Sequence, residues 1–579
     1  MKSKKLLATV LSAVITFSAV SAVSAAPVGR ESKSEPKTTT IFWENNTHNT
    51  RKATTGITRE KFNNSQDITK FFEKNIAKFG VKKGSLKNTK VVKDDKGKTN
   101  YHMIYQVDDI PVYYGRIVFT TKKDSSIDSI TGKIDATFEN DSWKNKVKLS
   151  KDNAIEKAKD SIKHDSLSKT NADLYLYNFE GKPYVAYLVN LITDNGDWNI
   201  FVNAENGSIV NQFNNTPTLV ENKDENLPNA EEIKKASKEP ANINNVINVN
   251  GQAAKGQGKT TLDGIVDIDL TYKDGKYYLK DSNKNIYLYD LNHSSIATYT
   301  RFKDRILRRS TLVENNSNKF TEDKHVTAVD GYVNLSKTYD YYKNKFNRNS
   351  IDNKGMNVEG FIHTGENFNN AFWRDDIGSM FFGDGDGIKF SSFASSLDVV
   401  GHELSHGITS KESKLKYEKE SGALNESFSD IMGVAIEGKN FQIGEDCYTP
   451  NIPGDALRDM EDPSKGGQPA HMKDFKNLPN DKYNDWGGVH TNSGIINHAA
   501  YLIAVGMEKS GESNSKDIMA NLFYRANCNY WDEITDFAKC RNDVVKVAKD
   551  LYGENSKHVQ IVENAFDQVG ITATPQLPL

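Results

Sequence analysis

The sequence predicts an α+β fold in which a β-rich lobe is followed by a helical lobe, with small α+β modules ahead of both. Alternating apolar and polar residues with turn signals predict strands between about residues 246 and 320. Beyond residue 396 the pattern changes to that of amphipathic helices. The chain has 579 residues, about four times the commonest domain size, so several domains are expected.

The composition is that of a soluble globular protein, with 37% apolar and 26% charged residues. Because Lys and Arg number 75 against 77 Asp and Glu, the charge balance favours neither nucleic acid nor an anionic membrane as a partner. Three cysteines exclude a disulfide-rich miniprotein. Cys528 and Cys540 could pair across two helices, which the sequence leaves open.

The N-terminus predicts an export signal. Lys2, Lys4 and Lys5 precede an apolar segment, residues 6–20, that is short for a membrane span. Small residues follow, so we expect cleavage after Ala25 and a secreted, extracellular protein. The alternative, an uncleaved anchor, fits this run of small residues poorly.

Residues 26–235, here called the presegment, are polar and Lys-rich and predict two small α+β modules. Alternation over residues 174–188 indicates a hairpin, and Asn206-Gly207 a tight turn. No compact cluster of His, Cys and carboxylates is found there, so no chemistry is expected. Residues 217–245 lose periodicity and predict an exposed linker open to proteolysis.

Two lobes follow, a β-rich lobe over residues 236–395 and a helical lobe over 396–579. Asp274-Gly275 predicts a hairpin turn inside the first, and residues 325–346 predict a helix. Helices are expected in the second lobe over 495–507, 516–526, 535–552 and 559–569, with Gly553 and Gly570 at C-cap positions. A cleft between the lobes is the natural place for a site.

The strongest local signal is His402-Glu403-Leu404-Ser405-His406. Residues four apart lie on one helix face, so both imidazoles can reach one zinc ion while Glu403 projects beside the open coordination position. The alternative is a solvated helix face that happens to carry two histidines.

The segment 422–430 supplies what a catalytic zinc site still lacks. Glu426 is the candidate third ligand, and Asp430 lies four residues on, where it can accept the outer N–H of a ligating histidine. Taken alone, the two acids would be read as an ordinary acidic helix face.

Together, four motifs resemble the thermolysin family of secreted neutral metalloproteases. They are His402-Glu-Leu-Ser-His406, Asn425-Glu426 with Asp430, Asn370-Ala-Phe-Trp373 and Gly487-Gly-Val-His-Thr-Asn-Ser-Gly494. The resemblance is specific from about residue 325 to the end, looser over the strands, and architectural over the presegment. It implies a zymogen whose propeptide assists folding, inhibits the enzyme and is removed by the enzyme itself.

The resemblance implies one catalytic zinc ion held by His402, His406 and Glu426, with Glu403 as general base and Asp430 orienting His402. It also implies that Tyr417 and His490 stabilise the oxyanion, with Asp485 orienting His490. Arg458 would contact the substrate backbone. Asn370 and Ala371 would align the peptide.

The resemblance further implies at least one structural calcium ion. Asp398, Glu437 and Glu445 match one calcium site, and Thr449 with Asp455 matches a separate calcium loop. The number of calcium ions stays open, because Asn440 and Gln442 stand where further acids are expected. The loop 313–318 lacks the acids of another calcium site of the family, so we expect no calcium there. We expect the segment Gly383 to Gly387 to form a tight turn rather than a calcium loop.

The resemblance also implies an apolar pocket for the residue after the scissile bond, and hence cleavage before bulky hydrophobic residues. Its lining would be Phe390, Phe393, Val399, Ile443 and Leu457. The expected partners are protein or peptide substrates and the propeptide, with no nucleic acid, no membrane in the mature form, and a monomer. Two rival functions remain: an exported binding protein with a structural metal, and a hydrolase of another bond such as an ester. Glu403 argues against the first, because a structural site needs no base.

Overall fold

The computed structural model describes residues 41–45, 50–54, 60–164, 167–179, 181–193, 196–219, 249–294, 306–307 and 310–572. All of them belong to one compact unit, Thr39–Leu579. The predicted signal segment, its cleavage after Ala25 and residues 220–245 of the predicted linker lie outside the described residues. The predicted domain limits at residues 25, 235 and 395 stay predictions.

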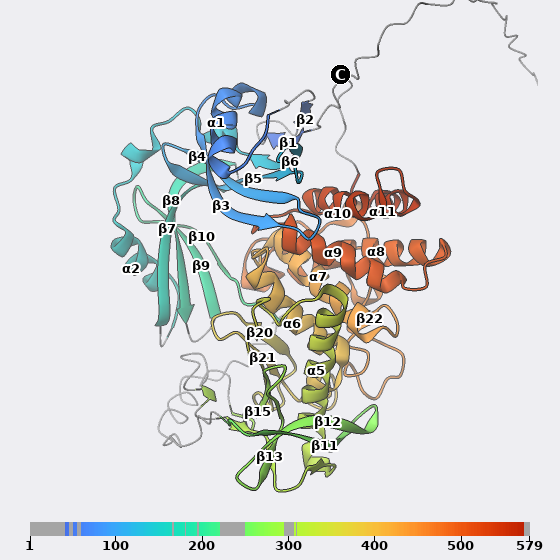
Figure 1. The fold of residues 1–579 in the computed structure, drawn as a ribbon. Helices are drawn as coiled ribbons and strands as arrows, with labels where there is room; N and C mark the ends of the chain where they lie inside the picture. Colours follow the sequence, from blue (N-terminus) through green and yellow to red (C-terminus); the bar gives the residue numbers. More distant parts are fainter. Residues whose placement is uncertain are drawn as a thin grey trace, which may run out of the picture. The chain divides into compact units, whose positions relative to one another are not determined.

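The described part of the presegment forms a ten-stranded sheet with two α-helices (Figure 1). Its strands are β1 (Ile41–Asn45), β2 (Thr50–Thr54), β3 (Ser85–Lys93), β4 (Thr99–Val107), β5 (Ile110–Thr121), β6 (Ile127–Ile134), β7 (Leu167–Phe179), β8 (Lys182–Thr193), β9 (Gly196–Asn203) and β10 (Ile209–Asn214). The helices are α1 (Ser65–Lys74) and α2 (Lys151–Ser161). A parallel pairing of Val112 with Leu176 joins β5 to β7, so the two expected modules share one sheet.

Two smaller sheets form the β-rich lobe. One has the order β17-β13-β12-β11-β18 and the other β14-β15-β19-β21-β20, with β16 paired to β15. The strands are β11 (Gln252–Thr260), β12 (Gly264–Lys273), β13 (Lys276–Tyr278), β14 (Lys280–Asp281), β15 (Ile286–Asp290), β16 (Thr311–Leu312), β17 (Glu314–Asn315), β18 (Lys319–Phe320), β19 (Val358–Ile362), β20 (Ala371–Arg374) and β21 (Ser379–Phe382). Asp274 (φ 49°) and Gly275 (φ 84°) make the predicted turn between β12 and β13.

Helices dominate the rest of the chain. They are α5 (Val326–Phe346), α6 (Leu397–Lys411), α7 (Lys419–Glu437), α8 (Asp485–Lys509), α9 (Ser515–Asn529), α10 (Phe537–Tyr552) and α11 (Lys557–Gln568), with a short pair of strands, β22 (Gln442–Ile443) and β23 (Arg458–Asp459). Each predicted helix coincides with one of these. Gly553 is the C-cap of α10, whereas Gly570 lies one residue beyond the C-cap of α11. The predicted α+β class and its two lobes are confirmed.

Glycines let α6 and α7 approach closely, which positions the site. A Cβ at Gly401 of α6 would lie 3.3 Å from the Cα of Gly433 on α7, and a Cβ at Gly433 would lie 2.6 Å from the carbonyl oxygen of Asp398. No larger residue fits that second position without moving backbone. The result is that every residue from Asp398 to Thr409 is buried.

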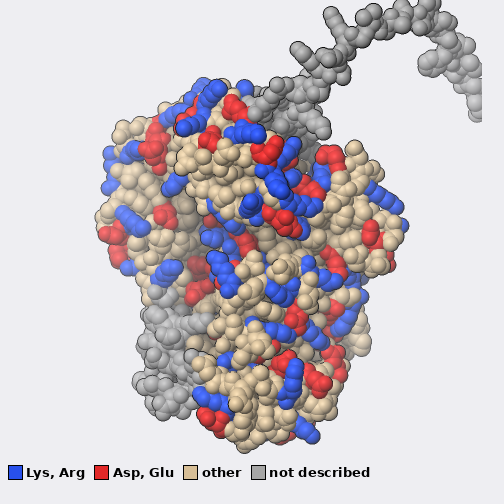
Figure 2. Space-filling model, viewed as in Figure 1, with Lys and Arg blue, Asp and Glu red and all other residues tan. Residues whose placement is uncertain are grey.

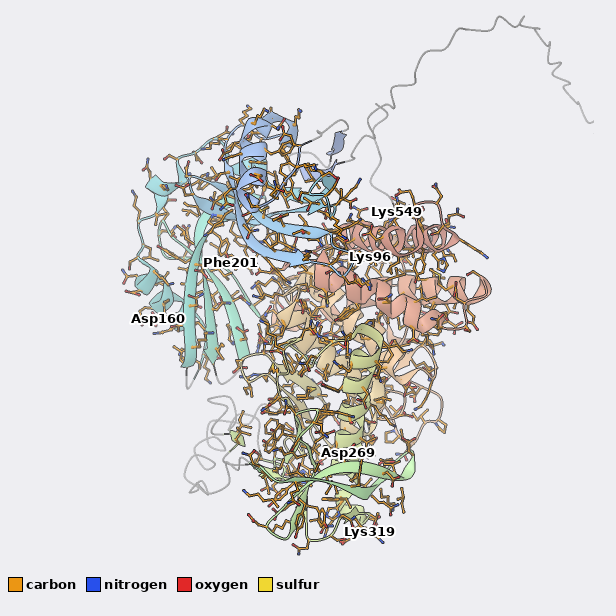
Figure 3. The ribbon with its side chains drawn as sticks, in the orientation of Figure 1. Lys96, Asp160, Phe201, Asp269, Lys319 and Lys549 are labelled. Atoms are coloured by element: carbon orange, nitrogen blue, oxygen red, sulfur yellow. The ribbon has the colours of Figure 1, made fainter. Side chains whose placement is uncertain are left out.

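The presegment contacts the helical lobe through ion pairs. Lys98 lies 2.6 Å from Asp550 of α10, and Lys546 of α10 lies 2.6 Å from Asp128. Lys96, labelled in Figure 3, donates to the main-chain oxygen of Asp550, next to the labelled Lys549. The docking surface between presegment and helical lobe is therefore charged and mutually complementary.

The surface carries both signs of charge close together. Figure 2 shows Lys and Arg interspersed with Asp and Glu over the visible face, without a large patch of one sign, as the balanced composition predicts. Among the described residues, no helix combines the length and the apolar character that crossing a membrane needs.

Candidate active site

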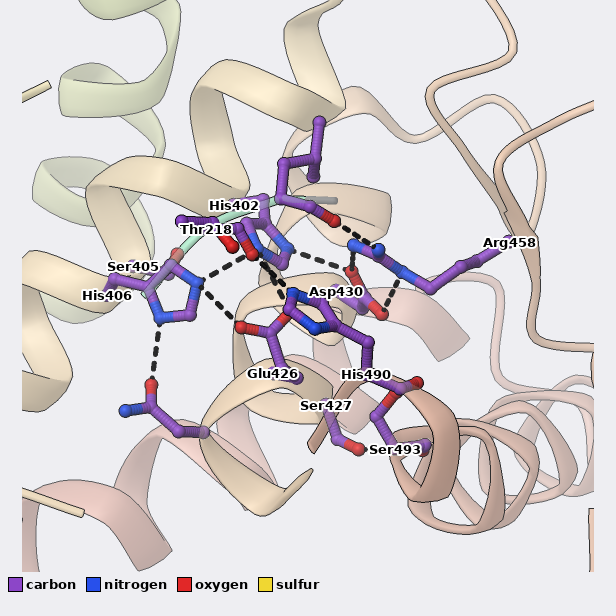
Figure 4. A network of polar contacts seen from close by, with 12 residues as sticks. Thr218, His402, Ser405, His406, Glu426, Ser427, Asp430, Arg458, His490 and Ser493 are labelled. Carbon is purple, nitrogen blue, oxygen red and sulfur yellow. Dashed lines mark hydrogen bonds and ion pairs between the residues drawn. The ribbon is translucent and has the colours of Figure 1, made fainter. Parts of the chain in front are cut away.

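Helix α6 places two imidazoles against each other in the protein interior. Nε2 of His402 lies 2.9 Å from Nε2 of His406, and both side chains are buried (Figure 4). The i, i+4 spacing puts the rings on one face of the helix.

The outer nitrogens of these rings fix both tautomers. Nδ1 of His402 lies 2.8 Å from Oδ1 of Asp430, and Nδ1 of His406 lies 2.9 Å from Oδ1 of Asn425. Both partners are acceptors, so each Nδ1 carries the hydrogen and each Nε2 presents a lone pair. Burial lowers the pKa of His402 to about 4, despite the nearby Asp430 carboxylate, which favours the neutral ring.

Glu426 of α7 completes a set of three donors. Its carboxylate oxygens lie 3.5 Å from Nε2 of His402 and 3.3 Å from Nε2 of His406. Ligands of tetrahedral zinc are about 3.4 Å apart. Two lone pairs facing each other beside a buried carboxylate repel unless a cation lies between them, so the residues present fit a zinc ion.

Glu403 lies between the two histidines in sequence and is fully buried. Neither of its carboxylate oxygens has a hydrogen-bond partner among the described residues. Burial, followed by the neighbouring charge of Glu426, raises the pKa of Glu403 well above its usual value. A buried carboxyl group with free oxygens is poised to exchange a proton with something that enters the site.

Asp430 is held by three donors besides His402. The guanidinium of Arg458 donates from Nε at 2.9 Å and from Nη2 at 2.7 Å, and Asn497 donates at 2.8 Å. Burial would raise the pKa of Asp430, but Arg458 and His402 outweigh it and lower the pKa. Asp430 therefore stays ionised and rigidly oriented toward His402.

A second pair of donors faces Glu426 from the other side. The Tyr417 hydroxyl lies 3.1 Å from Nε2 of His490 and donates to Glu426 at 2.5 Å, and Nδ1 of His490 lies 2.6 Å from Oδ1 of Asp485. Burial would lower the pKa of His490, but the charges of Asp485 and Glu426 outweigh it and raise the pKa to about 10. His490 is thus a charged donor at neutral pH.

The presegment runs across this site at Thr218 and Leu219. The main-chain oxygen of Thr218 lies 2.5 Å from Nε2 of His490 (Figure 4). It also lies 3.3 Å from the Tyr417 hydroxyl. The N–H of Leu219 donates to the Ala371 oxygen at 3.0 Å, and the Leu219 oxygen accepts from Nη1 of Arg458 at 2.7 Å. Ala371 begins β20, the edge strand of its sheet, so the presegment backbone pairs with a strand edge.

The apolar residues expected around a specificity pocket all belong to, or pack against, the large apolar core of the two lobes. Phe390, Phe393, Val399 and Ile443 are fully buried, and they share one continuous apolar cluster with the side chain of Leu219, which is 0% exposed. Leu457 packs against the same cluster. The side chain after the Thr218 carbonyl therefore lies in apolar surroundings.

The acids expected to bind calcium are less tightly gathered. Asp398, Glu437 and Glu445 do not belong to either group of described residues whose ligand atoms all lie within 4.8 Å of one another. Burial raises the pKa of Asp398 to about 7, and the charge of Glu445 adds to this effect. Burial likewise raises the pKa of Glu437 to about 8, with a further contribution from the charge of Asp398. Nζ of Lys439 lies 2.9 Å from Oε1 of Glu437, so the positive charge of this lysine offsets one of the negative charges. In the separate loop, Thr449 donates to Asp455.

The sequence predicted no role in the site for four residues that lie there: Thr218, Leu219, Asn425 and Asn497. Asn425 appeared within a motif but without a role. The expectation of an exposed linker from residue 217 is wrong for Leu219, which is buried because it fills the site. The apolar pair Leu219-Val220 at the start of a polar stretch was the available signal. The three cysteines are free thiols, so Cys528 and Cys540 do not pair.

Comparisons with known proteins agree with this geometry. A family model described as "Thermolysin metallopeptidase, catalytic domain" matches residues 255–410, and "Thermolysin metallopeptidase, alpha-helical domain" matches 413–571. In the presegment, "Fungalysin/Thermolysin Propeptide Motif" matches residues 84–134 and "Peptidase propeptide and YPEB domain" matches 148–213.

Individual relatives cover most of the chain. Bacillolysin of Bacillus cereus is 37% identical over 504 residues, which are 84% of this chain and 85% of the relative. Neutral protease B of Bacillus subtilis (strain 168) is 32% identical over 528 residues, 87% of this chain and 89% of the relative. A solved structure, the precursor of protealysin from Serratia proteamaculans, is 33% identical and covers 50% of this chain and 87% of its own, with a TM-score of 0.42. The chain therefore belongs to the thermolysin family and is a zinc metalloendopeptidase with the propeptide domains of a zymogen.

Proposed function

We propose that this protein is a secreted endopeptidase that cuts before bulky hydrophobic residues and removes its own presegment at the Thr218–Leu219 bond. One observation carries the proposal: the presegment lies in the site as a peptide substrate would. Its Thr218 carbonyl faces two donors, and the Leu219 backbone is held on both sides by Ala371 and Arg458. Family membership favours peptide hydrolysis over the rival functions of structural metal binding and ester hydrolysis.

The proposed chemistry divides among the buried groups. His402, His406 and Glu426 would hold the zinc ion, which supplies Lewis acidity toward water and the carbonyl oxygen when bound. Glu403 takes a proton from the attacking water and later delivers it to the leaving nitrogen. The raised pKa of Glu403 makes its carboxyl group a competent carrier in both directions. Asp430 keeps His402 in the tautomer that presents Nε2.

The oxyanion is assigned to Tyr417 and His490. Both already lie within hydrogen-bond distance of the Thr218 oxygen, where negative charge develops during attack. Asp485 maintains His490 as a charged donor. Interactions that strengthen as the charge develops accelerate the reaction, and one such donor contributes roughly 3 to 4 kcal/mol.

The specificity is assigned to the apolar cluster around Leu219. Phe390, Phe393, Val399, Ile443 and Leu457 offer no partner for a charge, so burying an unpaired charged side chain among them costs several kcal/mol or more. Burial of a Leu-sized side chain gains about 1.5 to 3 kcal/mol. Asn370 and Ala371 set the backbone register through the edge strand.

The presegment is proposed to act as inhibitor until this bond is cut. While uncut, it occupies the donors that a substrate needs and remains docked through Lys98, Asp128, Asp550 and Lys546. The same docking supports a role in folding the helical lobe. After cleavage, the new end at Thr218 is free to leave the site.

Calcium is proposed at Asp398, Glu437 and Glu445, with Thr449 and Asp455 as ligands in the separate loop. Burial and neighbouring carboxylates raise the pKa of Asp398 and of Glu437, and a cation of the hard type that prefers oxygen would stabilise such a pair in its ionised form. Because Lys439 already neutralises Glu437 and Asp446, we infer one calcium ion at the first site.

A gelatin zymogram with and without a zinc chelator tests the activity. Sequencing of the peptides released from a denatured protein tests the specificity. We expect chelator-sensitive clearing and cuts that fall before Leu, Ile, Val or Phe. A majority of cuts before Lys, Asp or Gly would contradict the pocket assignment, while clearing unaffected by the chelator would contradict the zinc chemistry.

A further inference from the structure

A second group of metal-binding side chains lies in the β-rich lobe, apart from the site above. His293, His363 and Asp384 each offer one ligand atom, and these atoms all lie within 4.8 Å of one another. Within the part of the chain that the structure describes, the only other such group is His402, His406 and Glu426. The motifs identified in the sequence give this group no metal-binding role.

The topology of the sheet brings these three residues together. His293 follows β15, His363 directly follows β19, and Asp384 follows β21. Strand β19 lies between the other two and is parallel to both, so the carboxyl ends of all three strands lie at the same end of the sheet. Side chains contributed by three neighbouring strand ends form a site that is anchored in the sheet rather than on a single loop.

The backbone around the group is fixed. His293 and His363 both adopt the left-handed conformation, with φ of 56° and 51°. The N–H of His293 donates to the main-chain oxygen of His363 at 2.9 Å, and the N–H of Gly365 donates to that of Ser294 at 3.1 Å. The unfavourable backbone conformation at two histidines is therefore held by the surrounding structure.

The spacing of the ligand atoms resembles that of the zinc-binding residues. Nδ1 of His363 lies 2.7 Å from Oδ2 of Asp384, and Nδ1 of His293 lies 3.3 Å from the same oxygen. For comparison, the separations within the first group run from 2.9 to 3.5 Å. The imidazole rings of His293 and His363 are 4.9 Å apart between centroids.

A simple hydrogen bond between His363 and Asp384 explains only part of this arrangement. It leaves unexplained why His293 turns the same nitrogen toward the same carboxylate. It also leaves the second carboxylate oxygen, Oδ1, buried without a hydrogen-bond partner among the described residues. A cation shared by all three residues accounts for both features.

We propose that His293, His363 and Asp384 bind a second divalent transition-metal ion, distinct from the catalytic zinc. Two imidazole nitrogens and one carboxylate suit zinc, cobalt or nickel rather than calcium or magnesium. The His293 side chain is 55% exposed, so the ion can enter from solution and keeps open positions for water.

Such an ion would stiffen the strand edge that binds the substrate. Gly383, next to Asp384, donates its N–H to the main-chain oxygen of Asn370 at 3.0 Å. Asn370 immediately precedes Ala371, which accepts the hydrogen bond from Leu219. A cross-link of three strand ends therefore supports β20 without contacting the reacting atoms.

The test uses the full-length chain carrying His402→Ala and His406→Ala, which removes the first metal site and prevents self-cleavage. Cobalt(II) is titrated with calcium present, and binding is followed by calorimetry and by the visible spectrum of the bound ion. We expect about one equivalent to bind. Adding His293→Asn, which tolerates the left-handed backbone, should weaken binding at least about tenfold. His164→Asn in the presegment is the matched control and should change nothing.

A second parent chain, Glu403→Gln, keeps the test valid if the double alanine variant misfolds. In the Glu403→Gln chain we expect two equivalents, falling to one when His293→Asn is added. The proposal is overturned if the double alanine variant binds no cobalt while the Glu403→Gln chain binds one equivalent. It is also overturned if the extra equivalent persists in His293→Asn or is lost equally in His164→Asn. Because the readout is metal content, failure of the proposed peptidase activity would leave this test unaffected.

Discussion

The main-chain oxygen of Thr218 lies 2.5 Å from Nε2 of His490, although 272 residues separate the two in sequence. Asp485 fixes the same imidazole as a charged donor from its other side. The presegment therefore places a peptide carbonyl where the donors of the site converge, and the following predictions depend on this contact.

Glu403→Gln should abolish self-processing and lower kcat/KM on peptides by about 10² to 10⁴-fold, because the amide cannot accept a proton from water. Zinc content should stay at the wild-type level, since Glu403 is not among the proposed ligands. Metal analysis and peptide kinetics on presegment-free enzyme check both points. Wild-type turnover in this variant would remove Glu403 from its assigned role.

His490→Ala should lower kcat by about 10² to 10³-fold with zinc retained, since one oxyanion donor is lost. Tyr417→Phe deletes the partner hydroxyl and keeps the ring, and it should lower kcat by a similar factor. KM should change little in either variant. Loss of zinc from His490→Ala would show that the residue supports the metal instead.

Substitutions at Leu219 should control the rate of self-cleavage. Leu219→Asp buries an unpaired charge at a cost of roughly 3 kcal/mol or more, so processing should slow by about 10²-fold or more. Leu219→Met nearly conserves volume and should change the rate less than about tenfold. Time courses of precursor loss compare the two. Equal rates for Asp and Met would mean that the apolar cluster does not select this residue.

Asp430→Asn should weaken zinc binding by about 10 to 100-fold, because the amide no longer holds the His402 tautomer as a carboxylate does. Competition with a chromophoric chelator measures this affinity. Asp459→Asn, at a carboxylate paired with Lys465 outside the site, serves as control. An unchanged zinc affinity in Asp430→Asn would contradict the orienting role.

Calcium removal should lower the thermal midpoint of the Glu403→Gln zymogen. Calcium at about 100 times its Kd stabilises by about 2.7 kcal/mol, which corresponds to about 2 to 4 °C for a chain of this size. Glu437→Gln should lose most of that shift. Scanning calorimetry with calcium and with EGTA gives the comparison. A midpoint indifferent to calcium in the parent chain would argue against the site at Asp398 and Glu437.

The sequence predicted the helices and the approach of His402 to His406, because both depend on local spacing. The helical period of the apolar residues predicted α10 and α11. The four-residue separation of His402 and His406 placed both side chains on one face of a helix. The turn at Asp274-Gly275 followed from the backbone conformations that these two residues tolerate.

Contacts between distant segments could not be predicted in this way. Nothing near Thr218 or Leu219 indicates that they pair with Ala371 and Arg458, because the contact depends on how the presegment docks. Likewise, His293, His363 and Asp384 meet only because their strands are parallel neighbours. The polar composition of residues 217–245 suggested an exposed linker, whereas Leu219 near its start is buried in the site.

The N-terminal sequence of the first fragment released by the purified zymogen tests the central claim most directly. Metal-free full-length protein is supplied with zinc, and the products are analysed by Edman degradation and intact mass, with Glu403→Gln as the uncleaved control. The structure predicts a fragment that begins Leu219-Val220-Glu221-Asn222 in the wild type and none in the variant. A first fragment beginning elsewhere, or cleavage that persists in Glu403→Gln, would contradict the account.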